Sequence, residues 1–245
     1  MRRALAASYG GAEVLSLSRG ASVPRPRGNE LLIRVTASSI NPIDAWMMRG
    51  YGKRLFPLLG VEPPFTPGRD VVGEIVEVGP LAWNYAVGEM VAAATHPTAE
   101  GGHADFTVCA ESAVARLPAT VDPVLAAALP FASLTAWKAL NGHAAVRRGQ
   151  SVLVHGATGS VGGFAVQYLK HLGCRVVATC RPEADQLERV HALGADVVLS
   201  LPEFLERATS GAGSDSHGGD NAELAWYVAV SRSLAESANW SQNLR

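Results

Sequence analysis

Residues 151–163 read Ser-Val-Leu-Val-His-Gly-Ala-Thr-Gly-Ser-Val-Gly-Gly, a short apolar run followed by a turn rich in glycine. Gly156, Gly159 and Gly162 recur at every third position, and the apolar residues after them keep helical spacing as far as Gly173. Glycines between a strand and a helix leave backbone N–H groups open to an anion, with no Cβ in the way. The stretch therefore predicts a dinucleotide-binding turn. The alternative, an ordinary flexible turn, leaves the regular glycine spacing unexplained.

The residues around this turn alternate between strand and helix patterns. We expect strands over 151–155, 175–179 and 196–200, and helices over 161–172 and 183–193. This order of elements is half of a doubly wound parallel sheet, which is ordinarily followed by a second half.

The chain after residue 201 does not repeat that alternation. We expect one more helix over 202–208, a disordered linker over 209–221, an amphipathic helix over 222–238 and a loose end. Strands four to six of the sheet are therefore expected to be missing, and the predicted sheet is an incomplete Rossmann sheet.

The first 120 residues have a different texture, with short β-type runs separated by glycine and proline turn signals. The runs lie at 31–38, 71–78, 90–94 and 106–109. They predict an antiparallel, barrel-like β domain. Asp122 followed by Pro123 is a helix-entry signal, and helical pieces are expected at 124–129 and 134–140. The predicted fold is thus β plus α/β, with a β domain over 1–121, a partial dinucleotide-binding domain over 122–208 and a poorly ordered tail over 209–245.

The end of the second strand decides which dinucleotide suits the turn. A site for NAD usually has Asp or Glu about 20 residues after the glycines, bound to the ribose 2′-OH. This chain has Thr179-Cys180-Arg181 there, and its nearest acids are Glu183 and Asp185. A guanidinium suits a 2′-phosphate, which a carboxylate would repel. The pattern favours NADPH with Arg181 at the 2′-phosphate; the alternative is a solvated loop charge.

Composition excludes several other classes of protein. The 245 residues carry 21 Lys and Arg against 22 Asp and Glu, a net charge of −1, so binding to nucleic acid is not expected. The mean hydropathy is +0.12, yet no apolar run approaches the roughly 18 residues of a membrane span, and no signal peptide is evident. Three scattered cysteines favour a reducing compartment. We expect a cytoplasmic protein, with the mitochondrion as the alternative.

A set of motifs stands in a characteristic order ahead of the glycine turn. They are Asn41-Pro42-Ile43-Asp44, Pro67–Gly73, Val76–Gly79, Val87–Val91, Gly101–Ala104 and Ala126–Leu140. Together they resemble the medium-chain dehydrogenase/reductase superfamily, and within it the zinc-independent quinone oxidoreductases, including zeta-crystallin and reticulon-4-interacting-protein-like members. The resemblance covers about residues 1–200. It implies a GroES-like β-barrel-type domain followed by a Rossmann sheet.

The resemblance also bears on metal binding. The zinc-dependent alcohol dehydrogenases of the superfamily carry a Cys and a His-Glu pair where this chain has Asn41–Asp44 and Gly68-Arg69-Asp70. Thiolate and imidazole ligands of a catalytic zinc are therefore lacking at these positions. His96, His103 and His155 lie far from any cysteine pattern, so no metal is expected.

Carried over residue by residue, the resemblance implies roles for side chains in both domains. Asn41 would lie beside the nicotinamide ribose, Thr135 would approach the nicotinamide or phosphates from a helix, and Tyr51 would lie in the cleft. The pyrophosphate contacts would come from Thr158, Gly159, Ser160 and Val161, within the turn bounded by Gly156 and Gly162. Plain structural alternatives exist: Asn41 as a turn residue, Asp70 pinning a loop, Tyr51 as a surface aromatic and Trp137 in the core.

The implied activity is hydride transfer from NADPH to a quinone or a conjugated enone, with Asn41 and Tyr51 as the catalytic candidates. The small-molecule substrate needs hydrogen-bond donors for the oxyanion or enolate that forms. Relatives continue for roughly another hundred residues that include the dimer edge, which is expected to be missing here. The alternative is therefore a non-catalytic truncated isoform or a dinucleotide-binding remnant, and NADPH binding weaker than that of a full-length relative is expected.

Overall fold

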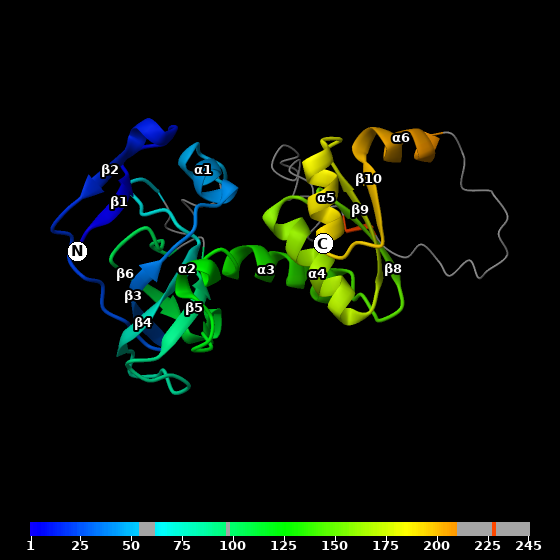
Figure 1. Ribbon diagram of the computed structural model, residues 1–245. Coiled ribbons are helices and arrows are strands. Elements are labelled where there is room, and N and C mark those ends of the chain that lie inside the picture. The colour runs from blue at the N-terminus through cyan, green and yellow to red at the C-terminus, as the bar shows by residue number, and fades with distance from the viewer. Residues whose placement is uncertain (54–61, 97–98, 210–226, 229–245) are drawn as a thin grey trace, which may run out of the picture. The chain divides into compact units, whose positions relative to one another are not determined.

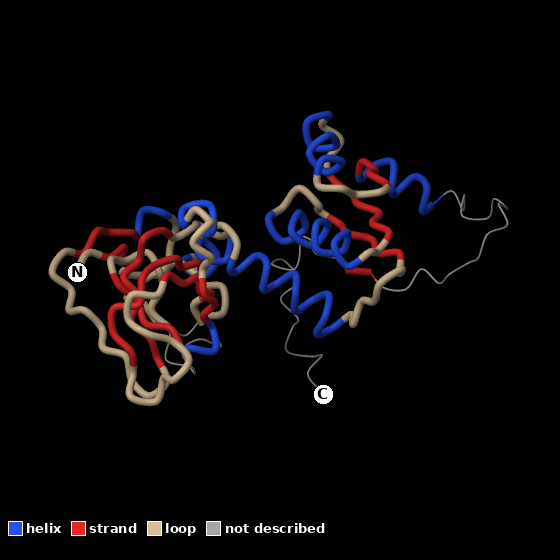
Figure 2. Tube along the Cα trace, turned by 60° about the horizontal axis from the view of Figure 1, so that its bottom comes forward, coloured by secondary structure: helices blue, strands red, loops and turns tan. Residues whose placement is uncertain are grey.

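The computed structural model describes residues 1–53, 62–96, 99–209 and 227–228 (Figure 1). The chain divides into two compact units, Met1–Phe131 and Ala132–Arg245. The strands of the first unit pair antiparallel, whereas those of the second form a parallel sheet accompanied by helices. Figure 2 shows these strands in red and the helices in blue. The predicted order, a β domain followed by a Rossmann-type sheet, is confirmed.

The first unit is built on a five-stranded antiparallel sheet with the strand order β6-β3-β4-β5-β7. Its strands are β3 (Glu30–Ala37), β4 (Asp70–Val78), β5 (Met90–Ala94), β6 (Phe106–Ala110) and β7 (Val114–Arg116). A separate hairpin pairs β1 (Arg3–Ala6) with β2 (Leu15–Ser18). The four expected β runs are thus confirmed, while β1, β2 and β7 were not predicted because they are only three or four residues long.

Apolar residues on the central strands form the core of this unit. Leu31 and Ile33 on β3 and Val71 and Ile75 on β4 are completely buried, and they belong to one cluster. Side chains at alternate positions of a strand point to the same face of the sheet, so these residues share the face that covers this cluster. Leu32 and Val72, on the opposite face, are also buried. This sheet supports the loop before β4, where the polar residues described below gather.

Short helices complete the first unit. They are the 3₁₀ helices η1 (Ala12–Val14) and η3 (Glu111–Ala113), and the α-helices α1 (Pro42–Met48) and α2 (Pro123–Ala126). Asp122 caps α2 as expected, because its carboxylate accepts hydrogen bonds from the backbone N–H groups of Val124 and Leu125 at 2.7 and 3.1 Å.

The helix expected over 134–140 begins earlier, which corrects the predicted boundary. It is α3 (Pro130–Trp137), and it continues directly into the π-helical segment η4 (Lys138–His143). Pro130 was expected to separate two helices, but a proline is tolerated at the first helical position, where its missing N–H has no partner to lose. Trp137, expected in the core, is 49% exposed, whereas Ala136 and Leu140 are fully buried.

The second unit contains a parallel sheet with the strand order β10-β9-β8-β11. The elements are β8 (Ser151–His155), α4 (Ser160–Leu172), β9 (Arg175–Cys180), α5 (Ala184–Ala192), β10 (Val197–Ser200), α6 (Leu201–Thr209) and β11 (Tyr227–Val228). The strand–helix alternation predicted from the sequence is confirmed through α6. Gly173 ends α4 in a left-handed conformation with φ +82°, which explains why a glycine stands there.

The segment over 222–238 differs from its prediction. Tyr227 and Val228 form a strand that pairs in parallel with Leu153 and Val154, so a helix at these two residues is wrong. The expectation that no strand follows β10 is also wrong, since β11 occupies the edge of β8 opposite β9. Helical spacing of apolar residues cannot reveal that a sheet edge elsewhere in the chain is available. The linker expected over 209–221 lies outside the described residues except for Thr209, which ends α6.

The core of the second unit lies between the sheet and α4. Five of its side chains are at most 1% exposed: Val152 and Val154 from β8, Ala165 and Leu169 from α4, and Val176 from β9. This packing orients the N-terminal end of α4 next to the carboxyl end of β8. Among the described helices, none combines the length and apolar character that a bilayer span requires.

Candidate functional site

The glycine turn between β8 and α4 is anchored to the neighbouring strand. The carbonyl oxygen of Thr179 on β9 accepts hydrogen bonds from the backbone N–H groups of both Gly156 and Ala157, each at 3.0 Å. Gly156 has φ +74°, a conformation that L side chains rarely adopt. The role of Gly156 in the turn is therefore conformational, because its N–H is already committed to the sheet.

The start of α4 leaves backbone donors without protein acceptors. Gly159 is the N-cap of this 13-residue helix and offers no side-chain cap, and its own N–H bonds to the carbonyl oxygen of Gly156. Within the described part of the chain, the N–H groups of Thr158, Ser160, Val161 and Gly162 have no acceptor. Such donors at a helix N-terminus, where the helix dipole is positive, suit an anion. The turn therefore fits a pyrophosphate.

The glycines differ in what they make room for. A Cβ added to Gly162 would lie 2.4 Å from the carbonyl oxygen of Gly156, so this glycine serves the close approach of helix and turn. A Cβ added to Gly159 would meet only that same oxygen, at 3.4 Å, and Gly159 is exposed. Gly159 thus faces outward, where a ligand would approach, and Gly162 faces inward.

The end of β9 brings a basic side chain to the same region of the sheet as the turn. Because His155 pairs with Thr179 in the parallel register, Arg181 comes two residues after a strand position level with the end of β8. Arg181 is exposed and forms no hydrogen bond or ion pair with any described residue. A hydrogen bond of 2.6 Å joins His155 Nδ1 and Thr179 Oγ1, so His155 and the buried Thr179 lock the two strand ends together. Sequence reasoning did not single out Thr179.

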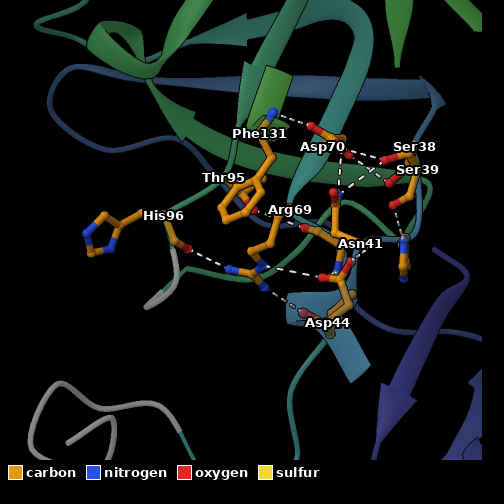
Figure 3. A network of polar contacts seen from close by, with 12 residues as sticks. Ser38, Ser39, Asn41, Asp44, Arg69, Asp70, Thr95, His96 and Phe131 are labelled. Atoms are coloured by element: carbon orange, nitrogen blue, oxygen red, sulfur yellow. Dashed lines mark hydrogen bonds and ion pairs between the residues drawn. The ribbon is translucent and has the colours of Figure 1, made fainter. Parts of the chain in front are cut away.

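A second group of polar residues lies in the first unit, around the loop before β4 (Figure 3). Asn41, the N-cap of α1, is 8% exposed, and its Nδ2 donates to Asp70 Oδ2 at 2.7 Å and to Ser39 Oγ at 3.2 Å. Asp70 Oδ1 accepts the backbone N–H of Phe131 at 2.6 Å. His103 Nε2 lies 3.0 Å from the carbonyl oxygen of Ser39. Asn41 is therefore held both by a neighbour in its own loop and by Asp70, which is 29 residues away in the sequence.

Asp44 and Arg69 form the other half of this group. Asp44 Oδ2 accepts the backbone N–H of Asn41 at 2.8 Å, and its Oδ1 accepts that of Gly68 at 2.9 Å. The Arg69 Nε lies 3.8 Å from Asp44 Oδ1, and both side chains are at most 2% exposed. Burial lowers the pKa of the Arg69 guanidinium below its usual range, and the carboxylate of Asp44 opposes that shift. Asp44 could have been found in the sequence, since Asn-x-x-Asp has the spacing of a capping box.

The remaining sequence candidates lie on the surface of their own units. Tyr51 follows α1 and is 39% exposed, with its ring centroid 6.3 Å from that of Trp46. Thr135 is exposed on α3, in the second unit. Asn41 and Tyr51 thus belong to one unit, and Thr135, the glycine turn and Arg181 belong to the other.

Comparisons with known proteins show what this chain is similar to. The sequence profile of the alcohol dehydrogenase GroES-like domain matches residues 27–119. Human (Homo sapiens) quinone oxidoreductase is 38% identical over 186 residues, covering 76% of this chain and 54% of its own. The mitochondrial NAD(P)H oxidoreductase RTN4IP1 of Bos taurus is 37% identical over 205 residues, covering 78% of this chain and 51% of its own. The mycobacterial protein Rv1454c, solved as a complex with NADPH, matches with a TM-score of 0.72 and 32% identity, over 86% of this chain and 64% of its own.

The chain belongs to the medium-chain dehydrogenase/reductase superfamily. Its relatives in the superfamily are quinone and NAD(P)H oxidoreductases. The chain spans about half the length of these curated relatives.

The zinc-dependent members of the superfamily bind their metal at positions that correspond to one region of this chain. Asn41, Asp44, Arg69 and Asp70 occupy that region here, and all four are at most 8% exposed. Across residues 1–53, 62–96 and 99–209, no three His, Cys, Asp or Glu side chains gather as metal ligands would. The guanidinium of Arg69 beside Asp44 places a positive charge there.

Proposed function

We propose that this chain carries the NADPH-binding and hydride-transfer apparatus of an oxidoreductase that reduces quinones or conjugated enones without zinc. The relatives whose names are quinone oxidoreductase and NAD(P)H oxidoreductase support this class of reaction. A neighbour solved with NADPH supports the choice of dinucleotide. Because the chain spans about half of the curated relatives, the activity itself is part of the proposal.

The observation that carries the proposal is the set of unpaired donors at the start of α4. The N–H groups of Thr158, Ser160, Val161 and Gly162 would bind the pyrophosphate, and the positive end of the helix dipole would favour its charge. Arg181, exposed and unpaired among the described residues, would bind the 2′-phosphate. This combination favours NADPH over NADH.

The chemistry requires little from the protein beyond binding and orientation. When bound, NADPH would supply the hydride for the quinone carbonyl system or for the β-carbon of the enone. In the proposal, Thr135 and Asn41 orient the nicotinamide end, and the hydroxyl of Tyr51 donates a hydrogen bond to the oxyanion or enolate. Solvent then provides the proton that completes the reduction.

The absence of zinc from the proposed mechanism rests on the chemistry of the donor set. Asp44 and Asp70 each accept several hydrogen bonds from neighbouring groups, so their oxygens are committed. Arg69 lies within 3.8 Å of Asp44, and a buried guanidinium would repel a divalent cation. A catalytic zinc needs ligands free to deprotonate and turn toward it, which this cluster does not offer.

A second candidate is a dinucleotide-binding protein without turnover. The observation that favours it is the length of the chain, about half that of the curated relatives. On this reading the glycine turn binds NADPH, while no substrate is reduced.

We propose the cytoplasm as the location of the protein. The three free cysteines support a reducing compartment, and the mitochondrion is the alternative because some relatives are mitochondrial.

The test combines NADPH fluorescence titration with NADPH oxidation in the presence of ortho- and para-quinones. Gly159→Asp is the control, because an aspartate at this N-cap position would stabilise α4 while its charge repels the pyrophosphate. Gly159→Asn provides the same cap without the charge. We expect NADPH binding, weaker than in a full-length relative, that Gly159→Asp abolishes and Gly159→Asn reduces less.

The outcomes separate the candidates. Turnover above the Gly159→Asp background supports the reductase, and binding with no such turnover supports the protein without turnover. Equal NADPH affinity in the wild type and in Gly159→Asp would remove the glycine turn from the site and overturn both.

A further inference from the structure

The carboxylate of Asp70 is completely buried and accepts hydrogen bonds from three residues in two segments of the chain (Figure 3). Its Oδ2 accepts from the hydroxyl of Ser39 and from Asn41 Nδ2, the latter at 2.7 Å. Its Oδ1 accepts from the backbone N–H of Phe131 at 2.6 Å. These partners are 31, 29 and 61 residues away in the sequence.

The charge of Asp70 is compensated by dipoles alone within the described residues. Its neighbour Arg69 is directed elsewhere, since its guanidinium donates to the carbonyl oxygens of His96 at 2.7 Å and Thr66 at 3.4 Å. A buried carboxylate with no ion-pair partner is costly unless its lone pairs are satisfied by hydrogen bonds. The three hydrogen bonds therefore stabilise the buried charge of Asp70, and Asp70 in turn fixes the positions of the three donors.

Two of these three donors belong to elements that carry candidate nicotinamide residues. Asn41 is itself one such residue, and its amide is oriented by Asp70. Phe131 is the second residue of α3, the helix that carries Thr135 four positions later. A carboxylate at the first turn of a helix stabilises the exposed N–H groups and the dipole of that helix.

We propose that Asp70 is a positioning residue, which sets the orientation of the Asn41 amide and the starting point of α3 for the nicotinamide end of NADPH. The proposal rests on the proposed function in one respect, namely that Asn41 and Thr135 face the nicotinamide. This role differs from merely pinning a loop, because the two oxygens of Asp70 bind the side chain of Asn41 and the backbone of α3 at the same time.

The variant that tests this role is Asp70→Asn. An asparagine keeps the size of the side chain, but an NH₂ group replaces one of its two acceptor oxygens. This NH₂ group would face either the N–H of Phe131 or the Nδ2 of Asn41, so one of the two hydrogen bonds would be lost. We expect kcat for quinone reduction to fall at least tenfold while the Kd for NADPH changes less than threefold. The Kd is spared because the glycine turn and Arg181 are far along the chain and remain intact.

Two further variants make the result specific. Ser38→Ala is the matched control, because Ser38 Oγ donates to the backbone carbonyl oxygen of Asp70 at 2.7 Å and leaves the carboxylate alone. The exchanged pair Asn41→Asp with Asp70→Asn restores one acceptor and one donor across the same contact. We expect kcat within twofold of wild type for Ser38→Ala. We expect the exchanged pair to be more thermally stable than Asp70→Asn alone.

Hydrogen exchange provides a readout that does not depend on turnover. In Asp70→Asn, the backbone amides of α3 should exchange at least tenfold faster than in Ser38→Ala, with the amides of α4 unchanged. If exchange in α3 is unaltered, the proposal is overturned whether or not the protein reduces quinones.

The kinetic outcomes separate the two hypotheses. A wild type with turnover sensitive to Gly159→Asp but a normal kcat in Asp70→Asn overturns the positioning role and leaves the proposed function standing. A wild type with no turnover, combined with fast exchange in α3 of Asp70→Asn, retains the structural coupling by Asp70 and overturns the reductase.

Discussion

Gly162 packs directly against the carbonyl oxygen of Gly156, so closely that a Cβ built on Gly162 would lie 2.4 Å from that oxygen and 3.0 Å from the Cα of Ala157. Both contacts are with backbone atoms, which cannot rotate away as the end of a side chain can. The approach of α4 to the turn therefore depends on the absence of a side chain at position 162.

We expect Gly162→Ala to destabilise the chain by about 1–3 kcal/mol, the usual cost of overpacking, and to weaken NADPH binding. The control is Gly163→Ala, whose Cβ would meet the carbonyl oxygen of Ala157 and the Leu193 Cδ1 at an ordinary 3.4 Å. An alanine in a helix interior generally gains about 0.5–1 kcal/mol over glycine. Urea unfolding of the two variants provides the comparison, and equal stabilities would show that the close approach is not required.

The charge of Arg181 provides a test of dinucleotide choice. Arg181→Asp should shift the ratio of NADPH to NADH affinity toward NADH by at least tenfold, because a carboxylate repels a 2′-phosphate and can accept a hydrogen bond from a 2′-OH. Arg175→Asp, a change of equal charge at the exposed opposite end of β9, is the control. Fluorescence titration with both dinucleotides measures the ratio. An unchanged ratio in Arg181→Asp would exclude Arg181 from the site.

The buried ion pair of Arg69 and Asp44 makes a prediction about stability. Arg69→Met removes the guanidinium and leaves the Asp44 carboxylate buried, so we expect a loss of about 3–5 kcal/mol in the free energy of unfolding. Arg34→Met is the control, because Arg34 pairs with Glu74 at the surface with 56% of its side chain exposed, and exposed pairs contribute at most about 1 kcal/mol. Equal effects in urea unfolding would contradict the distinction between buried and exposed pairs.

Cys109 predicts a loss of stability at high pH. Burial raises the pKa of its thiol to about 12, against the opposing charge of Arg69. In the unfolded chain the thiol ionises near pH 9, so the folded state binds more protons and becomes less stable as the pH rises from about 9 toward 12. This contribution is fully present below pH 9.

The matching experiment compares the wild type with Cys109→Ala in urea at pH 8 and pH 10.5. Since one pKa unit corresponds to about 1.4 kcal/mol, the wild type should lose about 2 kcal/mol more than the variant over this interval. Groups common to both proteins cancel in the difference. A pH dependence identical in the two proteins would indicate that the thiol is not buried as described.

Several parts of the fold could be predicted from the sequence because their causes are local. The run from Ser151 to His155, the glycines that follow and the helix that ends at Gly173 lie in one continuous stretch. Asp122 likewise caps the helix directly after it. In each case the residue types and their spacing act within a few positions, so no knowledge of distant partners is needed.

Other features could not be predicted because their partners are distant. The sequence suggested that Asp70 merely pinned a loop, yet it binds Asn41 and the backbone of Phe131, which lie on either side of it in the chain. The start of α3 at Pro130 and the exposure of Trp137 also depend on what packs nearby. The strand at Tyr227 forms because the edge of β8 is available, and no local pattern records that.

The sequence by itself determined the strand, glycine turn and helix that suit a dinucleotide, because backbone conformation there follows from the absence of side chains at fixed spacing. It also determined the basic residue at the end of β9. Only the tertiary structure decided that the N–H of Gly156 donates to the carbonyl oxygen of Thr179, and that Asp70 accepts hydrogen bonds from both Asn41 and the first turn of α3. The physical reason is that a buried polar group must find its hydrogen-bond partners wherever packing brings them, at any distance along the chain.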